Sequence, residues 1–235
     1  YGPDSRNPDS MNQYAPFRQA VAYAIDVDRI ARLVDGISVY SILGVGGDGP
    51  WLQYERDPDR AAELLAEACD MAERDCAADP PRVIFSATQG ADESTTIANY
   101  LVEMLGSLGI EVDVQLEDYQ DFQETVSNGT WDVGWWPQAS VPGAAATVRT
   151  LELFDPDAPA PEGTNFYQWG SSGSTAQSDV VERFRELLDV VKTSFDPSQI
   201  RSLAEAAEQV VDDLTFGCVG DDHHGSAEAL QSHHP

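Results

Sequence analysis

Apolar residues recur at helical or strand spacing along most of the chain, and changes of spacing divide it into elements. From Ala15-Pro16 to Gly36 they recur every three to five residues, which predicts one amphipathic helix. Asp57-Pro58 then supplies an N-cap and a first-turn proline for a second helix over 57–69. The first quarter of the chain is therefore predicted to be helical on both sides of a glycine-rich loop.

The pattern then alternates between strand and helix. Residues 82–88, RVIFSAT, predict a strand, 94–109 a helix ending at Gly109, and 110–116, IEVDVQL, a second strand. Strand, helix and strand with short connections form a parallel crossover unit. The sequence therefore predicts the α/β class.

Further elements follow the crossover unit. Asp118 is expected to cap a helix that Gly129 closes, and WDVGWW at 131–136 reads as a further strand. The segment 137–177 is rich in Pro, Gly, Ser and Ala, with one helix predicted near 144–154. Two amphipathic helices are expected beyond it, over 178–195 and 196–214, the second starting at another Asp-Pro pair.

Composition limits the partners. The chain has 235 residues, 42% of them hydrophobic, which is enough for one large domain or two small ones. Its formal charge of −28 arises from 41 acidic and 13 basic residues, a surface that repels nucleic acid and anionic headgroups. We also expect no direct membrane insertion, because no window approaches the roughly 18 apolar residues of a transmembrane helix. The start of the sequence lacks the pattern of a signal peptide, so in an exported protein the leader is expected outside this sequence.

The cysteines and histidines offer little catalytic chemistry. Cys69 and Cys76 flank a turn where they could form a disulfide in an oxidising compartment, or remain two free, partly buried thiols. All four histidines lie in the last residues, where CVGDDHHG could attract a metal ion only adventitiously, since adjacent histidines on an irregular segment point apart. We therefore expect no enzyme, no cofactor and no metal site.

One short motif has two interpretations. Asn128-Gly129-Thr130 matches an N-glycosylation sequon. Its position at a predicted helix end is equally well explained by capping.

Aromatic residues beside polar ones suggest binding without covalent chemistry. WDVGWWPQASVP leaves a strand into an irregular loop, and NFYQWGSSGS sets further rings among polar residues. Neighbouring Trp135 and Trp136 must point to opposite faces of a strand, so one of them is expected in the core. Each of these rings could equally fill core. The candidate ligand contacts are Trp136, Gln138 and Ser140, followed by Tyr167 and Trp169.

Three segments, in order, resemble segments of one family. FRQAVAYAIDVDRIARLVDG is similar to a helix of the form VRQA-x-x-YAID-x-x-x-I, DPDRAAELLAEA to YDPEKAKALLAEAG, and the run from 101 to 134 to LQ-x-x-L-x-x-IGI-x-V…G-x-x-D. The family is that of the extracellular solute-binding proteins, family 5, which serve peptide-type ABC importers and include oligopeptide-, dipeptide- and nickel-binding proteins. The matching residues of the first segment are Arg18, Gln19, Ala20, Tyr23, Ala24, Ile25, Asp26 and Ile30.

The resemblance implies a periplasmic-binding-protein-like (type II) lobe, with a mixed sheet flanked by helices and followed by C-terminal helices. The expected divisions are a polar lead-in over 1–14, a second (C-terminal) lobe over 15–215 and an irregular histidine-containing tail over 216–235. In the family this lobe closes on a first lobe around a solute. Peptide-binding members carry an aspartate in the loop after the tryptophan, where Ala139 stands here, so a free amino terminus would find no carboxylate at this position.

We therefore expect the substrate-binding component of an ABC importer, acting as a monomer outside the cytoplasm, either periplasmic or as a surface lipoprotein, and presenting a peptide-like solute or oligosaccharide to an ABC permease. An alternative is a lobe of this type reused as a sensory or regulatory interaction module.

Overall fold

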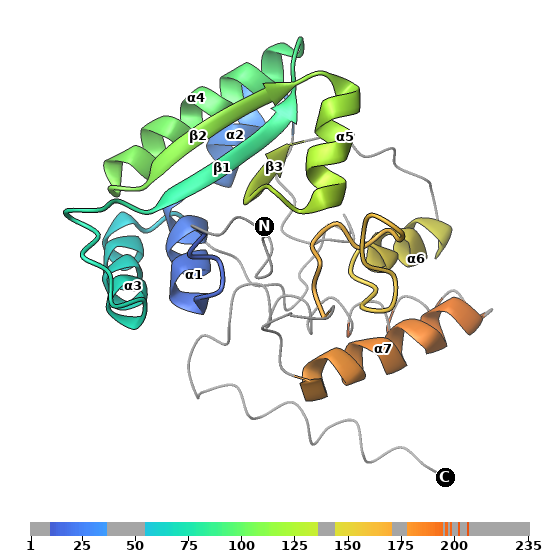
Figure 1. Cartoon of the computed structure of the whole chain (residues 1–235). Helices are drawn as coiled ribbons and strands as arrows, with labels where there is room; N and C mark the ends of the chain where they lie inside the picture. The colour runs from blue at the N-terminus through green and yellow to red at the C-terminus, as the bar shows by residue number, and fades with distance from the viewer. Residues whose placement is uncertain are drawn as a thin grey trace.

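The computed structural model describes residues 10–36, 55–135, 144–170 and 178–194, with four single positions from 196 to 206. Figure 1 shows a small sheet with helices around it, above a second group of helices and loops. The elements are α1 (Ala15–Ala24), α2 (Val27–Leu33), α3 (Pro58–Met71), β1 (Arg82–Thr88), α4 (Asp92–Ser107), β2 (Glu111–Glu117), α5 (Tyr119–Asn128), β3 (Val133–Trp135), α6 (Ala144–Glu152) and α7 (Ser178–Thr193).

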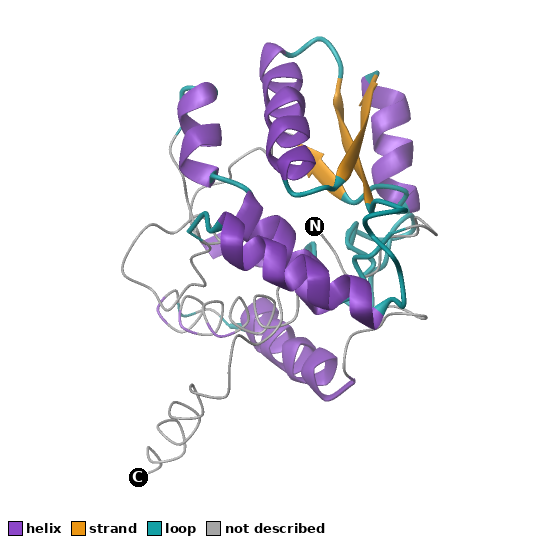
Figure 2. Cartoon of the chain, turned by 90° about the vertical axis from the view of Figure 1, so that its left-hand side faces the viewer, coloured by secondary structure: helices purple, strands orange, loops and turns teal. Residues whose placement is uncertain are grey.

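The sheet confirms the predicted crossover. Its strand order is β2-β1-β3, and β1 pairs in parallel with both neighbours. Helices α4 and α5 both contact the sheet, and Figure 2 shows the strands lying between two helices. The three described strands are all parallel, so the mixed character expected of the sheet is not seen among them.

The single helix predicted from Ala15 to Gly36 is wrong. α1 ends at Ala24, Ile25 takes an extended conformation with φ −89° and ψ 128°, and α2 starts after Asp26. The Asp26 carboxylate accepts a hydrogen bond of 2.7 Å from the backbone N–H of Arg29, as an N-cap does. Helical periodicity continues across the break, but a capping side chain within it favours a new helix start.

The other predicted caps are confirmed. The Asp57 carboxylate accepts from Arg60 N at 3.0 Å, and that of Asp118 accepts from Gln120 N at 2.9 Å and from Asp121 N at 3.1 Å. Gly129 ends α5 in the left-handed region with φ 66°, where a side chain would be strained. Several boundaries shift by one or two residues: α3 ends two residues after the predicted end, α4 begins two residues before the predicted start, and β2 lies one residue later than predicted. β3 covers Val133–Trp135 of the predicted 131–136, and the last of those positions lies outside the described residues.

Apolar side chains gather in connected clusters. One lies between α1, α3 and the amino end of the sheet, with Phe17, Leu64 and Leu105 almost fully buried. A second joins β1 to α4, and a third joins α6 to α7 through Phe154, Phe184 and other residues. The sheet therefore has its own core, and α7 packs in a separate one.

The α3–β1 connection is held by covalent and polar contacts. Cys69 and Cys76 form a disulfide with their Cα atoms 6.0 Å apart, so of the two alternatives the structure has the bonded one. Within that turn Arg74 donates to the carbonyl oxygens of Asp79 at 2.9 Å and Pro80 at 3.0 Å. These contacts fix where β1 begins.

The expected division of the chain into a lead-in, a lobe and a tail stays a prediction, although two residues of the lead-in are buried. Met11 and Asn12, which we placed in a polar lead-in, are 3% and 1% exposed. The helix predicted over 196–214 falls almost wholly outside the described residues, as does the tail over 216–235.

Candidate functional site

The three strands end at one edge of the sheet. Thr88, the last residue of β1, lies opposite Glu117 of β2, and Ala87 lies opposite Trp135, the last residue of β3. In open α/β sheets, ligands bind outside the carboxyl ends of the strands. This carboxyl edge is therefore the candidate site, and the chain leaves it from β3 into residues 136–143.

Trp135 packs against an apolar cluster at this edge. Its half-buried side chain joins the cluster of β1 and α4, together with Ile30 and Val34 at α2. Trp135 is thus partly buried against this cluster, and which of the two adjacent tryptophans is the core residue stays a prediction. Trp136, Gln138 and Ser140 lie outside the described residues.

Trp169 is placed in the core. Its side chain is 2% exposed and meets the Phe184 ring edge to face, with the ring centroids 5.0 Å apart. The backbone carbonyl of Trp169 also accepts a 2.7 Å hydrogen bond from the fully buried amide of Asn165. A ring buried against Phe184 of α7 has almost no surface for a solute, so the structure gives Trp169 a packing role and not the expected ligand contact.

Tyr167 joins the cluster of α6 and α7 to a further cluster made of Phe122, Val126 and Trp131. Its ring stacks on Phe154 at 4.5 Å between centroids and meets Trp131 edge to face at 5.7 Å. Burial raises the pKa of the Tyr167 hydroxyl to about 12, so the side chain is neutral at physiological pH. This residue links the sheet, through Trp131, to the α6–α7 group.

The polar group that organises the opposite, amino end of the sheet was not singled out from the sequence. Asp132 is 1% exposed, and its carboxylate accepts hydrogen bonds from Ser10 Oγ at 2.7 Å, Asn12 Nδ2 at 3.0 Å and Ile84 N at 2.8 Å. The buried Arg18 guanidinium donates to the carbonyl oxygen of Asn12 at 2.6 Å. The available signal was the G-x-x-D pattern, in which Asp132 is the last position.

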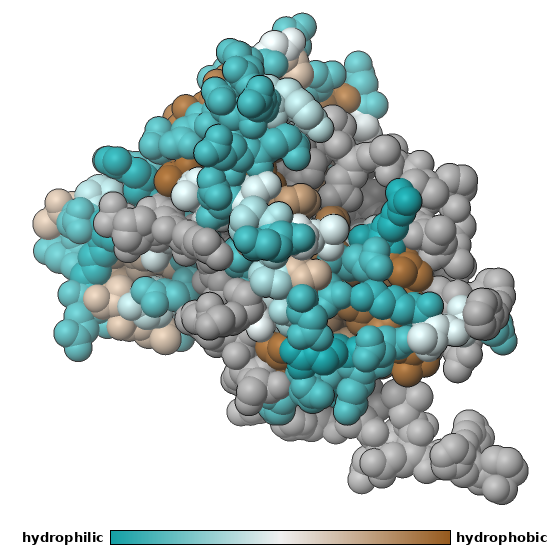
Figure 3. Space-filling view, turned by 45° about the vertical axis from the view of Figure 1, so that its right-hand side comes forward, coloured by the Kyte–Doolittle hydropathy of each residue, from teal (hydrophilic) through white to brown (hydrophobic). Residues whose placement is uncertain are grey.

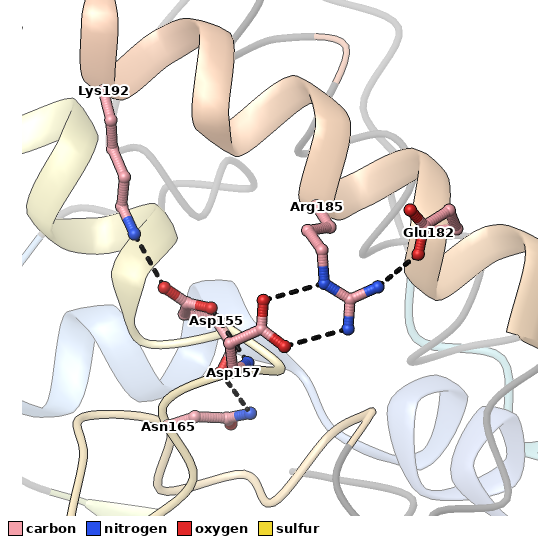
Figure 4. Close-up of polar contacts among 6 residues, drawn as sticks. All are labelled: Asp155, Asp157, Asn165, Glu182, Arg185 and Lys192. Carbon is pink, nitrogen blue, oxygen red and sulfur yellow. Dashed lines mark hydrogen bonds and ion pairs between the residues drawn. The ribbon is translucent and has the colours of Figure 1, made fainter.

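A second polar group holds α7 against the loop that follows α6 (Figure 4). Arg185 grips the Asp157 carboxylate with two nitrogens, Nε at 2.8 Å and Nη2 at 3.0 Å, and also pairs with Glu182. The Lys192 ammonium donates to Asp155 at 2.7 Å. The Arg185 guanidinium lowers the pKa of the Asp157 carboxyl below its ordinary value. We call these residues the α7 clamp.

The described surface beside the carboxyl edge is acidic. Asp92, Glu93 and Asp118 are exposed beside the carboxyl edge, and the face in Figure 3 is largely hydrophilic. No group of three or more His, Cys, Asp and Glu residues in the described ranges is placed to hold a metal ion. The tail with Cys218 and the histidines lies outside those ranges. None of the described helices has the length and hydrophobicity needed to cross a membrane.

Comparison with known proteins gives one family match. Residues 10–151 match the model of the bacterial extracellular solute-binding proteins, family 5 Middle. That segment contains all three strands, the buried Asp132 at the amino end of the sheet and the carboxyl edge. No curated protein matches the sequence.

Solved structures match over most of the chain. HbpA2 from Haemophilus parasuis is 19% identical with a TM-score of 0.69, over 92% of this chain and 40% of that protein. The oligopeptide-binding protein AppA from Bacillus subtilis, in complex with a nonapeptide, is 19% identical with a TM-score of 0.64, over 86% and 40%. MelB from Agrobacterium fabrum, in complex with stachyose, is 16% identical with a TM-score of 0.62, over 86% and 32%.

At these identities the likeness shows the fold, which is the expected periplasmic-binding-protein type. The chain spans about 40% of the length of the first two proteins and 32% of the third.

Proposed function

The chain belongs to the bacterial extracellular solute-binding proteins of family 5, and on that premise we propose that it is the second lobe of the substrate-binding component of an ABC importer. It captures a peptide-like or other polar solute for uptake. The family is one of binding proteins, not of enzymes. The observation that carries the proposal is the family match over a segment whose parallel strands share one carboxyl edge.

The solute contacts are assigned to the loop that leaves this edge. Trp136 stacks on the solute, and Gln138 and Ser140 form hydrogen bonds to it. Support comes from Trp135, which is partly buried against the cluster of β1 and α4, since its neighbour in a strand would point to the opposite face. Trp169 and Tyr167 are not part of the proposed contact set, because both rings are engaged in packing.

The proposed solute is a polar compound without a net charge. Asp92, Glu93 and Asp118 beside the edge disfavour anions. Ala139 offers no carboxylate to an ammonium group, which favours modified peptides or oligosaccharides over peptides with a free amino terminus. Two structural relatives were solved, one with a nonapeptide and the other with stachyose, so both peptides and oligosaccharides are included in the proposal.

The proposed location is outside the cytoplasm, with an ABC permease as partner. The family is described as extracellular, and the Cys69–Cys76 disulfide is of a kind that persists in oxidising compartments.

The test uses the full-length protein as its gene encodes it. Thermal shift against a panel of peptides, N-acetylated peptides and oligosaccharides identifies a solute, because a ligand that binds only the folded state raises Tm. Calorimetry then compares two adjacent variants. Trp136→Ala is expected to weaken binding about tenfold or more, roughly 1.4 kcal/mol, with little change in Tm.

Trp135→Ala is the matched control. It is expected to lower Tm because it empties part of the cluster at α2 and β1. Solute affinity unchanged in Trp136→Ala, together with a lowered Tm, would reject the contact role. A full-length protein that binds none of these classes would reject the proposed function.

A further inference from the structure

The sequon Asn128-Gly129-Thr130 lies at the carboxyl end of α5. Asn128 is the last helical residue and Gly129 is its left-handed C-cap. Both Asn128 and Thr130 are exposed. The acceptor amide and the hydroxyl residue that N-glycosylation requires are therefore both at the surface.

The helix end is satisfied without the Asn128 side chain, which separates the two interpretations of the motif. The last carbonyl oxygens of α5 accept hydrogen bonds from five other groups: Gly129 N at 3.2 Å, Thr130 N at 3.3 Å, Thr130 Oγ1 at 3.4 Å, Trp131 Nε1 at 3.2 Å and Gln168 Nε2 at 3.5 Å. Among the described residues no hydrogen bond or ion pair involves the carboxamide of Asn128. Capping is done by Gly129 and its neighbours, so it does not account for an asparagine at 128.

The sequon and the proposed solute edge lie at opposite ends of β3. α5 leads through Trp131 and Asp132 into the amino end of β3, whereas the solute loop leaves the carboxyl end of β3 (Figure 1). A bulky group on Asn128 would therefore stand at the opposite end of the sheet.

We propose that Asn128 is an N-glycosylation site, modified outside the cytoplasm by an oligosaccharyltransferase that uses a lipid-linked sugar phosphate. The step forms a bond from Asn128 Nδ2 to the anomeric carbon of the sugar and breaks the bond between that carbon and the phosphate oxygen. The lipid phosphate leaves, and a base on the transferase takes the amide proton. The inference goes beyond solute binding, and its failure would leave the proposed binding function intact.

The test is peptide mapping of the protein purified from the organism that encodes it. Trypsin yields peptide 83–149, because no Lys or Arg lies between Arg82 and Arg149. We expect this peptide to be heavier by a whole number of sugar residues, and fragmentation to place the added mass on Asn128. Asn99 is an internal control in the same peptide, since it is exposed but followed by Tyr100-Leu101 and is expected to stay unmodified.

Variants expressed in the same organism complete the test. Asn128→Gln and Thr130→Ala are each expected to abolish the added mass, whereas Thr130→Ser keeps the sequon and the added mass. Unmodified Asn128 in the native protein, or modification that persists in Thr130→Ala, would overturn the proposal.

Discussion

At the scale of single residues, Asp132 gathers three long-range hydrogen bonds on one buried carboxylate. Its partners Ser10 and Asn12 are 122 and 120 positions away in the sequence, and Ile84 is 48 positions away. A buried carboxylate is costly unless hydrogen bonds satisfy it, and here three donors do so. Asp132 thus fixes the chain before α1 against the start of β3.

Asp132→Asn is expected to destabilise the fold by about 2–3 kcal/mol, because an amide donor would then meet donors already aimed at the carboxylate. Urea unfolding at neutral pH measures the change. Asp113→Asn, at an exposed position of β2, is the matched control and is expected to change stability by less than about 0.5 kcal/mol. Equal, small effects of the two substitutions would show that Asp132 has no anchoring role.

The role of a residue could be predicted from the sequence where its partners are close to it in the chain, and could not where they are distant. The caps at Asp57 and Asp118 were predictable because each carboxylate bonds a backbone N–H two or three residues later. Asp132 was not, because its donors come from distant segments. Trp169 was predicted to contact ligand for the same reason, since nothing near it in the sequence indicates that its ring packs against Phe184.

At the scale of elements, the disulfide ties the end of α3 to the turn before β1. It closes a short loop, with a sequence separation of 7. In the chain-entropy model a loop of this length contributes about 2 kcal/mol, an account that depends on the model chosen. Cys69 is already part of the core beside α1, so the constraint acts on a well-packed region.

Reduction of the disulfide is therefore expected to lower the free energy of unfolding by about 2 kcal/mol without abolishing the fold. Urea unfolding with and without a reductant measures this. The double variant Cys69→Ala/Cys76→Ala should be destabilised to a similar extent and should no longer respond to reductant. A reductant effect of the same size in the double variant would locate the sensitivity elsewhere.

The α7 clamp is expected to respond to pH. The Asp157 carboxyl has a pKa of 3.8 when unperturbed, and Arg185 lowers it in the fold. A lowered pKa means that the pair stabilises the fold above about pH 4 and that this contribution is lost as pH falls below that value. Because the Asp157 side chain is 63% exposed, the effect is small, about 0.5 kcal/mol.

The stability difference between the wild type and Asp157→Asn should therefore shrink as pH falls from about 7 to about 3. Denaturant unfolding at several pH values measures it. Comparing the two proteins at each pH cancels the change in repulsion among the other carboxylates. A difference that stays constant down to pH 3 would contradict an ionic contribution from Asp157.

At the scale of the whole molecule, the α/β class was predictable and the site was not. Hydrophobic spacing is set by local burial, so β1, α4 and β2 were found within one or two residues. The site depends on which segments meet at the carboxyl edge. The break at Asp26 shows the limit of periodicity even within one element, because a cap can interrupt a helix without disturbing its apolar face.

Lys192 is the only lysine of the 235 residues, and in the structure its ammonium is held by Asp155 while its side chain is 31% exposed. A protease specific for lysine can therefore cut this chain at one bond only, near the end of α7. Cleavage requires the cut segment to leave its helix and enter the active site of the protease. The appearance of two fragments over time thus reports how often the end of α7 opens, without any added label.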